Sequence, residues 1–594
     1  MGGKKVGGVL VWLVLAGVLG SCASAPRASP SPEPGTGGGG EGGLSRRERQ
    51  EFYHLPQGNE HLWLAVLRAL PSRATLEGRV SGFQSFLDDP ERFGLLADPE
   101  HPEGLPVGVA LVPSSERQPA ARVGVNCAAC HVGEFHYRGR RVRVDGAPSL
   151  LSMDDFNREA VEVLSRTLAD RSRLLDFLQR LAMHLPEQTR GGPRRFDGPV
   201  DAARLQVAYP DTDLTPDGES SAQEKLVAQV EWYCGSQTPT PCGPPTLGPE
   251  PERVREFDEQ LTQYVHELSR KQVRTVPDAI RLLRGHLLYF MRLGKLKFGT
   301  YAGPGRVDAF GVARGVLFGP RAAGVLVSPV SYPCLWEFQT QPWLHWDGNT
   351  NAMMERNIGQ ALGMGATVDP KTFASSILPR NLAELERLSR KIESPRWPQD
   401  VFGKLDPARI ERGSQLFARE CQSCHGPTGS VVPLSEVRTD GNRARSFGAE
   451  VEGLPFPAAL QDVLSRVKQR AYAREGMRAE EIQPLDPGLI YWRAPEGYVA
   501  RPLDGVWATP PYLHNGSVPT LWHLLQPASA RPARFPMGQQ EYDPERVGYV
   551  TEVSGAPRFT FDVSMPGNGN AGHEYGTALS DEEKRDLLEY LKSL

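Results

Sequence analysis

Hydrophobic and polar positions divide the chain into four regions. Residues 1–22 contain Lys4 and Lys5 near their start and continue into an unbroken apolar run from Val9 to Leu19, which is the pattern of an export signal. The run is too short for a comfortable transmembrane helix. Residues 23–45 are rich in Pro, Ser and Gly, cannot bury a core, and therefore predict a disordered tether. Residues 46–400 and 401–594 carry the patterns of two folded domains.

Within the first domain, the spacing of apolar residues from Leu62 to Leu70 predicts a buried helix. Residues 135–146 alternate in character and predict a short hairpin. Residues 155–300 have the pattern of helices, such as 254–271 and 276–293, joined by Pro- and Gly-rich loops. We interpret 155–300 as a helical insertion.

The second domain has clear helix boundaries at both ends. Asp406 as N-cap and Pro407 at the first helical position predict a helix there. Ser580 and Glu583 form a capping box for a last helix. Gly413 would let the two helices cross closely, which is the N-helix and C-helix arrangement of the cytochrome c fold.

Two C-x-x-C-H motifs, at 127–131 and 421–425, carry the chemistry. Two thiols at this spacing can add to the vinyl groups of one haem, and the adjacent His becomes the proximal ligand of the iron. A zinc site or a redox dithiol is the alternative for either motif. The residues concerned are Cys127, Cys130 and His131 in the first motif and Cys421, Cys424 and His425 in the second.

The spacing of the two motifs and the composition suggest a fold class. The motif histidines lie 294 positions apart, more than a plain tandem of cytochrome domains requires. The 62 Gly and 52 Pro residues indicate long irregular connections. We expect a mainly α protein with cytochrome c-like haem domains, long irregular loops and the helical insertion between two covalently attached c-type haems.

Charge and the remaining cysteines indicate which partners and which redox compartment to expect. Lys and Arg number 67 against 71 Asp and Glu, a net charge of −4 that suggests no nucleic-acid partner. Cys234 and Cys242 flank a turn-rich segment and could form a disulfide, which fits an oxidising compartment. Cys334 is left over. It could be a buried thiol, or it could replace one of these two cysteines in the disulfide, because the sequence alone does not fix the pairing.

The segment Leu19-Gly-Ser-Cys22 looks like the lipobox of bacterial lipoproteins. Lipidation of Cys22 would anchor the protein to a membrane and place it in the cell envelope, in the periplasm or at the outer membrane. The alternative is ordinary cleavage after Ala25, but Pro26 disfavours it.

Several residues are candidates for holding the second haem. His573 and Met565 both precede the last helix, where the distal ligand of a cytochrome c comes from, and we choose His573 because its flanking glycines allow close approach. His514 lies in a compact turn that we place against the haem edge. Arg306 could clamp a haem propionate, or it could pair with Asp308.

Other residues are candidates for the reaction at the first haem. Trp336 and Trp346 belong to an aromatic-rich stretch that forms either ordinary core or a pocket wall and electron relay. Glu355 could donate or accept a proton near bound oxygen, or form an ion pair. The possible distal ligands of this haem in the preceding sequence are His54, His61 and His136, although lone histidines are usually structural.

These motifs together resemble a known group. The segment Tyr512-Leu-His514-Asn-Gly516 resembles the one that follows the second haem in bacterial dihaem cytochrome c peroxidases. The fuller set is most similar to the rubber-oxygenase-like dihaem cytochromes. It comprises Arg92-Phe-Gly-Leu-Leu, the first haem motif, Gly305-Arg306-Val-Asp308, Trp346-Asp-Gly348, Glu355-Arg-Asn357 and Asn570-Ala-Gly-His573-Glu-Tyr-Gly576.

The resemblance implies an extracytoplasmic protein that uses dioxygen at its N-terminal haem, with His131 proximal. It also implies that His425 and His573 ligate a second haem that relays electrons. Two features are not expected of a freely secreted rubber-cleaving enzyme. One is the long segment between the two motifs, and the other is the lipobox.

We therefore expect a haem-dependent oxidoreductase, either dioxygenase-like or peroxidase-like. Its partners would be dioxygen or hydrogen peroxide, an apolar organic substrate and a small redox donor protein. The alternative function is a non-catalytic dihaem electron-transfer lipoprotein, in which protein side chains fill both axial positions of each iron.

Overall fold

A computed structural model describes residues 43–594 except 116–118, 186–199, 237–239, 246–250, 265–271, 337, 427, 452, 487 and 553–554. The predicted export signal, its lipobox and most of the tether lie outside the described residues. At the start of the described residues, Leu44 is buried and Ser45 caps α1 (Arg46–His54). No helix in the described part of the chain is long and apolar enough to cross a membrane.

The expected mainly α class is wrong. Helices make up 43% and strands 13% of the structure, which is mixed α and β. The described residues form one three-stranded and seven two-stranded sheets. Many strands are only two residues long, such as β7 (Arg306–Val307), and so short a strand has no detectable alternation in the sequence. Segments that we expected to be irregular connections therefore pair into small ladders.

The three-stranded sheet stands before the first haem motif. It has the order β1-β3-β2 and is antiparallel, with β1 (Leu62–Trp63), β2 (Val109–Val112) and β3 (Arg122–Val125). The helix predicted from Leu62 begins two residues later, as α2 (Leu64–Ala69), and it is buried as expected apart from Arg68. A further short helix, α3 (Arg73–Leu76), follows.

The first haem motif sits between this sheet and a hairpin. Strand β3 leads through Asn126 into the single turn α4 (Cys127–Cys130). The hairpin of β4 (Val132–Tyr137) and β5 (Arg140–Asp145) follows directly and confirms the prediction for residues 135–146. Regular hydrogen-bonded strands thus fix the motif on both sides.

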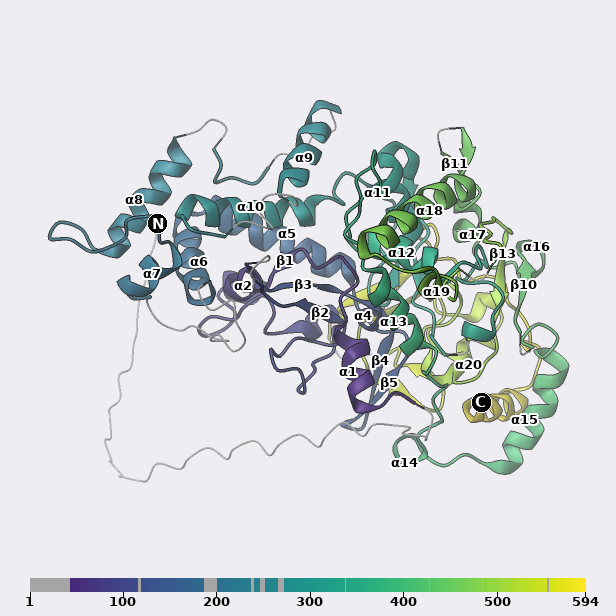
Figure 1. Ribbon diagram of the computed structural model, residues 1–594. Coiled ribbons are helices and arrows are strands. Elements are labelled where there is room, and N and C mark those ends of the chain that lie inside the picture. The colour runs from purple at the N-terminus through teal and green to yellow at the C-terminus, as the bar shows by residue number, and fades with distance from the viewer. Residues whose placement is uncertain are drawn as a thin grey trace, which may run out of the picture. The chain divides into compact units, whose positions relative to one another are not determined.

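Helices dominate the segment predicted as an insertion. They are α5 (Met153–Ala169), α6 (Arg171–His184), α7 (Ala202–Ala208), α8 (Ala222–Gly235), α9 (Pro251–Gln263) and α10 (Val276–Met291). Helices α5 and α10 pack side by side (Figure 1). The predicted disulfide between Cys234 and Cys242 is present, which confirms that prediction. These helices share one apolar core with the three-stranded sheet.

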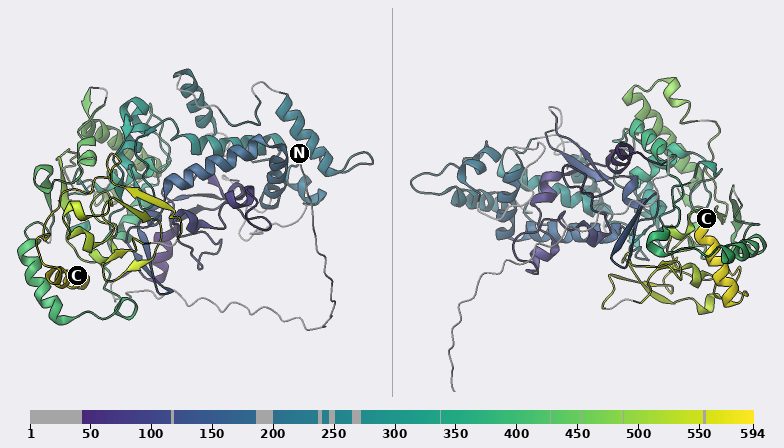
Figure 2. Two further views of the ribbon diagram at one scale, coloured as in Figure 1. Left: turned by 180° about the vertical axis from the view of Figure 1, so that it is seen from behind. Right: turned by 90° about the horizontal axis from the view of Figure 1, so that it is seen from below.

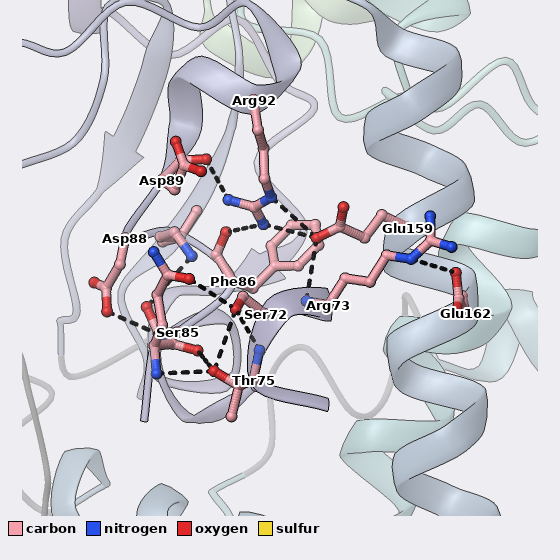
Figure 3. A network of polar contacts seen from close by, with 12 residues as sticks. Ser72, Arg73, Thr75, Ser85, Phe86, Asp88, Asp89, Arg92, Glu159 and Glu162 are labelled. Carbon is pink, nitrogen blue, oxygen red and sulfur yellow. Dashed lines mark hydrogen bonds and ion pairs between the residues drawn. The ribbon is translucent and has the colours of Figure 1, made fainter. Parts of the chain in front are cut away.

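A polar cluster around Arg92 ties the preceding loop to α5 (Figure 3). Arg92 lies in the 3₁₀ turn η1 (Pro90–Phe93). Its Nε donates to Glu159 Oε1 at 3.0 Å, and its guanidinium also donates to the carbonyls of Phe86 and Asp89. The guanidinium carbon lies 4.1 Å from the centre of the Phe93 ring. Charge-assisted bonds of this kind are stronger than neutral ones, so Arg92 is a structural clamp.

The middle of the chain contains short strands and longer helices. They are β6 (Lys297–Phe298), α11 (Ala309–Ala323), β8 (Val325–Leu326), β9 (Val330–Ser331), η3 (Phe338–Thr340), α12 (Met353–Gly363), α13 (Pro379–Ser389) and α14 (Gln399–Phe402). Strands β6 and β8 pair in parallel, and β7 pairs with β9 in antiparallel fashion.

The C-terminal part begins with α15 (Pro407–Glu420) and ends with α21 (Asp581–Ser593). Between them lie the helices α16 (Leu434–Val437), α17 (Asn442–Ser446), α18 (Phe456–Glu475), α19 (Ala479–Ile482), η4 (Val506–Ala508), α20 (Leu521–Leu524) and η5 (Ala528–Ala530). The strands are β10 (Ser430–Pro433), β11 (Glu450–Val451), β12 (Leu454–Pro455), β13 (Gly497–Ala500), β14 (Arg534–Met537), β15 (Tyr542–Asp543), β16 (Gly548–Tyr549) and β17 (Phe559–Asp562).

Helices α15 and α21 cross closely, as predicted. The helix at the C-terminus lies beside α15 in Figure 1 and in the views of Figure 2. Asp406 caps α15, and Ser580 with Glu583 forms the predicted capping box of α21. A Cβ on Gly413 would lie 2.1 Å from the carbonyl oxygen of Asp586, so the crossing requires glycine at position 413.

The apolar cores draw on both sides of residue 400. Phe135 of the β4–β5 hairpin packs against Trp507 with ring centres 5.8 Å apart. Leu464 of α18, which follows residue 400, belongs to the same apolar core as Met354 of α12, which precedes it. Each haem motif is therefore surrounded by side chains from both halves of the chain.

Candidate haem-binding sites

The local sequence orients the first motif. Asn126 caps α4 by accepting from the amide of Ala128, and its Nδ2 donates to the carbonyls of Phe52 and Leu55. Because His131 Nδ1 lies 2.8 Å from the carbonyl oxygen of Pro333, Nδ1 must carry the proton and donate. The lone pair is then on Nε2, which is how a second partner prepares a histidine for a metal.

A cavity of about 630 Å³, mouth included, opens beside this motif. We call it the N-terminal cavity. Apolar walls come from α13 and from Leu335, Phe338 and Leu344. Its chemically active lining residues are Cys127, His131, Cys334, His345, Met353, Arg356, Glu386 and Arg501.

A chain of hydrogen bonds fixes the tautomer of His345 in this cavity. Arg443 pairs with Asp347, and Asn349 Nδ2 donates to Asp347 Oδ2 at 3.2 Å. Asn349 Oδ1 is thereby turned to His345, so the Nδ1 of His345 donates to it at 2.8 Å. Burial and the charge of nearby Arg356 lower the pKa of His345 well below its usual value. His345 is thus neutral, with its lone pair on Nε2.

Positive charge gathers around this histidine. The guanidinium groups of Arg356, Arg443 and Arg501 all act on His345. Burial lowers the pKa of Arg356. Among the described residues, Nε of Arg501 is buried without a hydrogen-bond partner. A haem carries two propionates, and buried guanidinium groups suit carboxylates, so the residues present fit a haem in this cavity.

The second motif follows α15 directly. Its His425 Nδ1 donates to the carbonyl of Arg501 at 2.6 Å, which again leaves Nε2 for a ligand. A cavity of about 1550 Å³, mouth included, opens over Cys421, Cys424 and His425. We call it the C-terminal cavity. Its walls are mainly apolar, and they include His514, His573 and Tyr575.

His573 faces His425 across the C-terminal cavity. The centres of the two imidazole rings are 6.1 Å apart. Two metal–nitrogen bonds of about 2 Å on opposite sides of one iron, with about 1.1 Å from each nitrogen to its ring centre, would place the centres roughly 6 Å apart. The pair therefore has the spacing of two axial ligands. Burial lowers the pKa of His573 to about 4, which keeps it neutral.

The backbone holds His573 in place. Its amide donates to the carbonyl of Val437 at 2.8 Å, and its φ is +47°, a value rare for a residue with a side chain. A Cβ on the preceding Gly572 would lie 2.3 Å from the carbonyl carbon of Arg438, so glycine is needed for this close approach. Met565, the alternative ligand, is 41% exposed.

Two other predicted residues line the C-terminal cavity. His514 stacks on Tyr498 with ring centres 3.8 Å apart, and its place at a haem edge stays a prediction. Trp346 donates from Nε1 to the carbonyl of Ser331 at 2.8 Å, and the guanidinium of Arg501 lies 5.1 Å from its ring centre. The aromatic stretch thus contributes one tryptophan to the C-terminal cavity.

The structure places three predicted residues elsewhere. Trp336 lies in the core and donates to the carbonyl of Asp504 at 2.7 Å. Glu355 is buried and forms an ion pair with Lys468 at 3.1 Å. Arg306 donates from all three nitrogens to the oxygens of Ala302, Asn515 and Asn568. These contacts account for each side chain structurally, and their predicted roles in catalysis or haem binding stay predictions.

The distal candidates from the early sequence have other partners. His54 Nε2 pairs with Asp98, His136 Nε2 pairs with Glu134, and His61 Nε2 lies 3.4 Å from Ser376 Oγ. Besides His131 of the motif itself, the histidine among the lining residues of the N-terminal cavity is His345. The sequence alone does not single out His345, because no spacing rule connects it with a motif more than 200 residues away.

The two cavities share lining residues. Cys334 and Arg501 each line both of them. Each proximal histidine also donates to a carbonyl from these shared segments, His131 to Pro333 and His425 to Arg501. The two cavities are therefore adjacent and joined through the backbone.

Comparison with known proteins supports a haem domain. A family model described as RoxA-like, cytochrome c-like matches residues 497–536, the segment that contains His514. The uncharacterized protein y4iJ of Sinorhizobium fredii is 28% identical over 93% of this chain and 92% of its own length. The uncharacterized protein y4iM of the same organism is 32% identical over 44% of this chain and 63% of its own length. The chain thus carries a RoxA-like cytochrome c-like domain, which implies covalently bound c-type haem.

Proposed function

We propose that the protein is a dihaem c-type cytochrome oxidoreductase of the bacterial cell envelope. It uses dioxygen or hydrogen peroxide at the N-terminal haem and passes electrons through the C-terminal haem. When bound, each haem supplies an iron that can change oxidation state, and the first can also bind a small ligand. The cytochrome c-like domain supports the class, and the contrast between the two cavities supports the division of roles.

This division of roles between the two haems rests on one observation: the ring centres of His425 and His573 are 6.1 Å apart. A haem held between two neutral imidazoles has no position for a substrate, which suits electron transfer. The burial of both rings keeps them neutral, because burial disfavours the charged form. The C-terminal haem is therefore assigned to electron transfer.

The N-terminal cavity has the groups that oxygen chemistry uses. His345 presents an unprotonated Nε2, and Arg356 adds a positive charge in the same cavity. A neutral histidine can accept a proton from a bound peroxide, and a guanidinium stabilises negative charge that develops on oxygen. Glu386 lines the cavity but is paired with Arg390, so we assign the proton acceptor to His345.

The cellular location and the partners are proposed from features of the sequence. A lipid anchor at Cys22 would hold the protein at a membrane of the envelope, where a disulfide such as Cys234–Cys242 persists. A small redox protein would supply electrons to the C-terminal haem, and an apolar organic compound is the proposed substrate of an oxygenase reaction.

One observation favours the alternative function of a non-catalytic electron carrier. His345 and Met353 both line the N-terminal cavity, and either side chain type can be the sixth ligand of a haem. A His131–His345 or His131–Met353 pair would close the site to oxygen.

Carbon monoxide binding to the reduced, haem-loaded protein tests the proposal. An open N-terminal haem predicts one carbon monoxide per two haems, because the C-terminal haem is protected by His573. Binding of no carbon monoxide would contradict the proposal and favour the carrier. Binding of two would contradict the assignment of His573.

A further inference from the structure

A third cavity lies apart from both haem motifs. It is about 1560 Å³, mouth included, and shares no lining residue with the N-terminal or C-terminal cavity. Its walls include side chains of the three-stranded sheet, of α5 and of the end of α10. Most are apolar, among them Leu67, Leu95, Val123, Leu151, Phe156 and Phe290. We call it the apolar cavity.

Hydrogen bonds hold these walls in place. Arg92 donates to Glu159 of α5 and to the carbonyl of Phe86, which ties the loop containing Leu87 and Leu95 to α5 (Figure 3). A hollow with fixed apolar walls and few polar groups is the usual form of a small-molecule site. The charged side chains of the lining then decide which class of molecule fits.

Two carboxylates line the apolar cavity, and each is already balanced. Asp154 accepts from the amide of Ala302 at 2.9 Å, and the positive charge of Arg306 acts on it. Asp308 accepts from two backbone amides, each 3.0 Å away, and the positive charge of Arg314 acts on it. Neither carboxylate therefore leaves an unbalanced negative charge.

Two arginines line the same cavity, and they differ in their partners. Arg158 forms an ion pair with Asp155. Arg292, the C-cap of α10, has no carboxylate partner among the described residues. Its Nη1 donates to the carbonyl of Tyr289 at 2.5 Å, and its guanidinium carbon lies 3.9 Å from the centre of the Tyr289 ring. The lining thus keeps one positive charge without a counter-charge.

The free edge of Arg292 is suited to a carboxylate. Stacking on Tyr289 occupies a face of the guanidinium and leaves its N–H edges available. Nε and Nη2 have no hydrogen-bond partner among the described residues. Both remain accessible, because neither belongs to the fully buried polar atoms that lack a partner. Two parallel N–H groups of this kind match the two oxygens of one carboxylate.

Glycine leaves room beside this edge. A Cβ on Gly365 would lie 2.7 Å from Nη2 of Arg292, so a larger residue at position 365 would press on the guanidinium. The neighbouring Gly363 and Met364 both line the apolar cavity. The free edge of Arg292 therefore borders a part of the wall that has little side-chain bulk.

The buried groups near Arg292 supply no counter-charge either. Glu60 accepts from two backbone amides, each 2.9 Å away, and the charge of Arg122 acts on it. Burial and the charges of Arg122 and Arg292 lower the pKa of His61 to about 3, so this histidine is neutral. A ligand that brings its own negative charge would balance Arg292.

We propose that the apolar cavity binds a long-chain carboxylate, such as a fatty acid, with its carboxylate on Nε and Nη2 of Arg292 and its hydrocarbon chain along the apolar walls. Removing the chain from water and forming a charge-assisted pair both favour binding. This inference goes beyond the proposed haem function. The cavity shares no lining residue with either haem cavity, so binding does not depend on which haem is open.

Calorimetric titration of the full-length, haem-loaded protein tests the proposal with two probes. The probes are decanoate and decanamide, which have the same number of heavy atoms, but only decanoate is charged at about pH 8. We expect saturable binding of decanoate that is at least about tenfold tighter than that of decanamide, the effect of one charge-assisted pair. Equal affinities, or no saturable binding of decanoate, would overturn the proposal.

Arg292→Gln tests the residue that holds the carboxylate. Decanoate should then bind no more tightly than decanamide. Arg284→Gln is the matched control, because Arg284 is a half-buried arginine of the same helix that donates only to carbonyls and does not line the cavity. It should leave the affinity for decanoate unchanged. Undiminished decanoate binding to a folded Arg292→Gln protein would overturn the proposal.

A cavity-filling variant locates the hydrocarbon chain. Leu293→Trp places a larger side chain on a half-buried lining residue and should weaken decanoate binding at least about tenfold. Leu317→Trp is its control, because Leu317 is also half-buried and is not among the lining residues. The haem absorption spectrum checks that each variant is folded. Undiminished binding to a folded Leu293→Trp protein would overturn the proposal, and carbon monoxide stoichiometry would still test the haem function separately.

Discussion

Replacing Gly413 by alanine should weaken the helix crossing that holds the C-terminal haem. The added Cβ would lie 2.1 Å from the carbonyl oxygen of Asp586 and 2.7 Å from Cβ of Tyr590. Ordinary contacts of this kind exceed about 3 Å, so α15 and α21 must separate by roughly 1 Å. Overpacking costs about 1–3 kcal/mol, against about 1 kcal/mol by which alanine is favoured over glycine within a helix. We expect the free energy of unfolding to fall by up to about 2 kcal/mol.

The separation should also reach the haem site. Helix α15 ends beside Cys421, and α21 follows His573 by a few residues. A shift of this size changes the spacing of His425 and His573, which is now 6.1 Å between ring centres. The assay is urea denaturation of the haem-loaded protein, followed by the absorption of the low-spin haem.

Gly359→Ala is the matched control. Gly359 also lies within a helix, α12, but the nearest atom to its added Cβ would be Leu464 Cδ1 at 3.5 Å, an ordinary contact. This variant should be neutral or more stable by up to about 1 kcal/mol. If Gly413→Ala were as stable as Gly359→Ala, the reasoning about the close crossing would be refuted.

Three further predictions concern other parts of the molecule. His573→Ala should convert the C-terminal haem from low spin to high spin in the absorption spectrum, whereas Met565→Ala should leave it low spin; the reverse result would make Met565 the ligand. Burial lowers the pKa of His286 to about 4, below the ordinary value near 6.5. Between pH 4 and 6.5 the unfolded chain therefore binds more protons than the folded one, so the free energy of unfolding should fall by about 3 kcal/mol as the pH drops from 6.5 to 4. In urea denaturation at several pH values, His286→Gln should reduce this dependence on pH. The paired replacement Cys234→Ser and Cys242→Ser should cost about 2–3 kcal/mol, because it releases a short closed loop, and limited proteolysis should then cut this segment faster; unchanged cleavage would contradict that estimate.

Sequence patterns with a local physical cause predicted the structure well. Capping at Asp406 and Ser580 and the glycine at the helix crossing depend on residues close in the chain or on one small side chain, and all three features are present. The alternation of residues 135–146 likewise predicted the hairpin. The fold class failed because two-residue strands pair over long sequence distances and leave no periodic signal.

The residues around the two cavities also differ in whether a local sequence pattern could find them. Cys127 and His131 line the N-terminal cavity, and Cys421, Cys424, His425 and His573 line the C-terminal cavity, whereas Cys130 lines neither. Their haem-binding roles stay predictions. Glu355 and Arg306 could not be placed from sequence, because their partners Lys468 and Asn568 are more than 100 residues away. His345 was missed for the same reason: long-range packing brings it to the cavity of His131.

The low-temperature electron paramagnetic resonance spectrum of the oxidised, haem-loaded protein distinguishes an oxidoreductase from an electron carrier, because spin state reports the coordination of each iron. We expect one low-spin signal, from the haem between His425 and His573. We expect a second signal, from the haem of His131, that is high spin or changes when cyanide is added. Two low-spin signals that cyanide leaves unchanged would contradict an open N-terminal haem and identify the protein as an electron carrier.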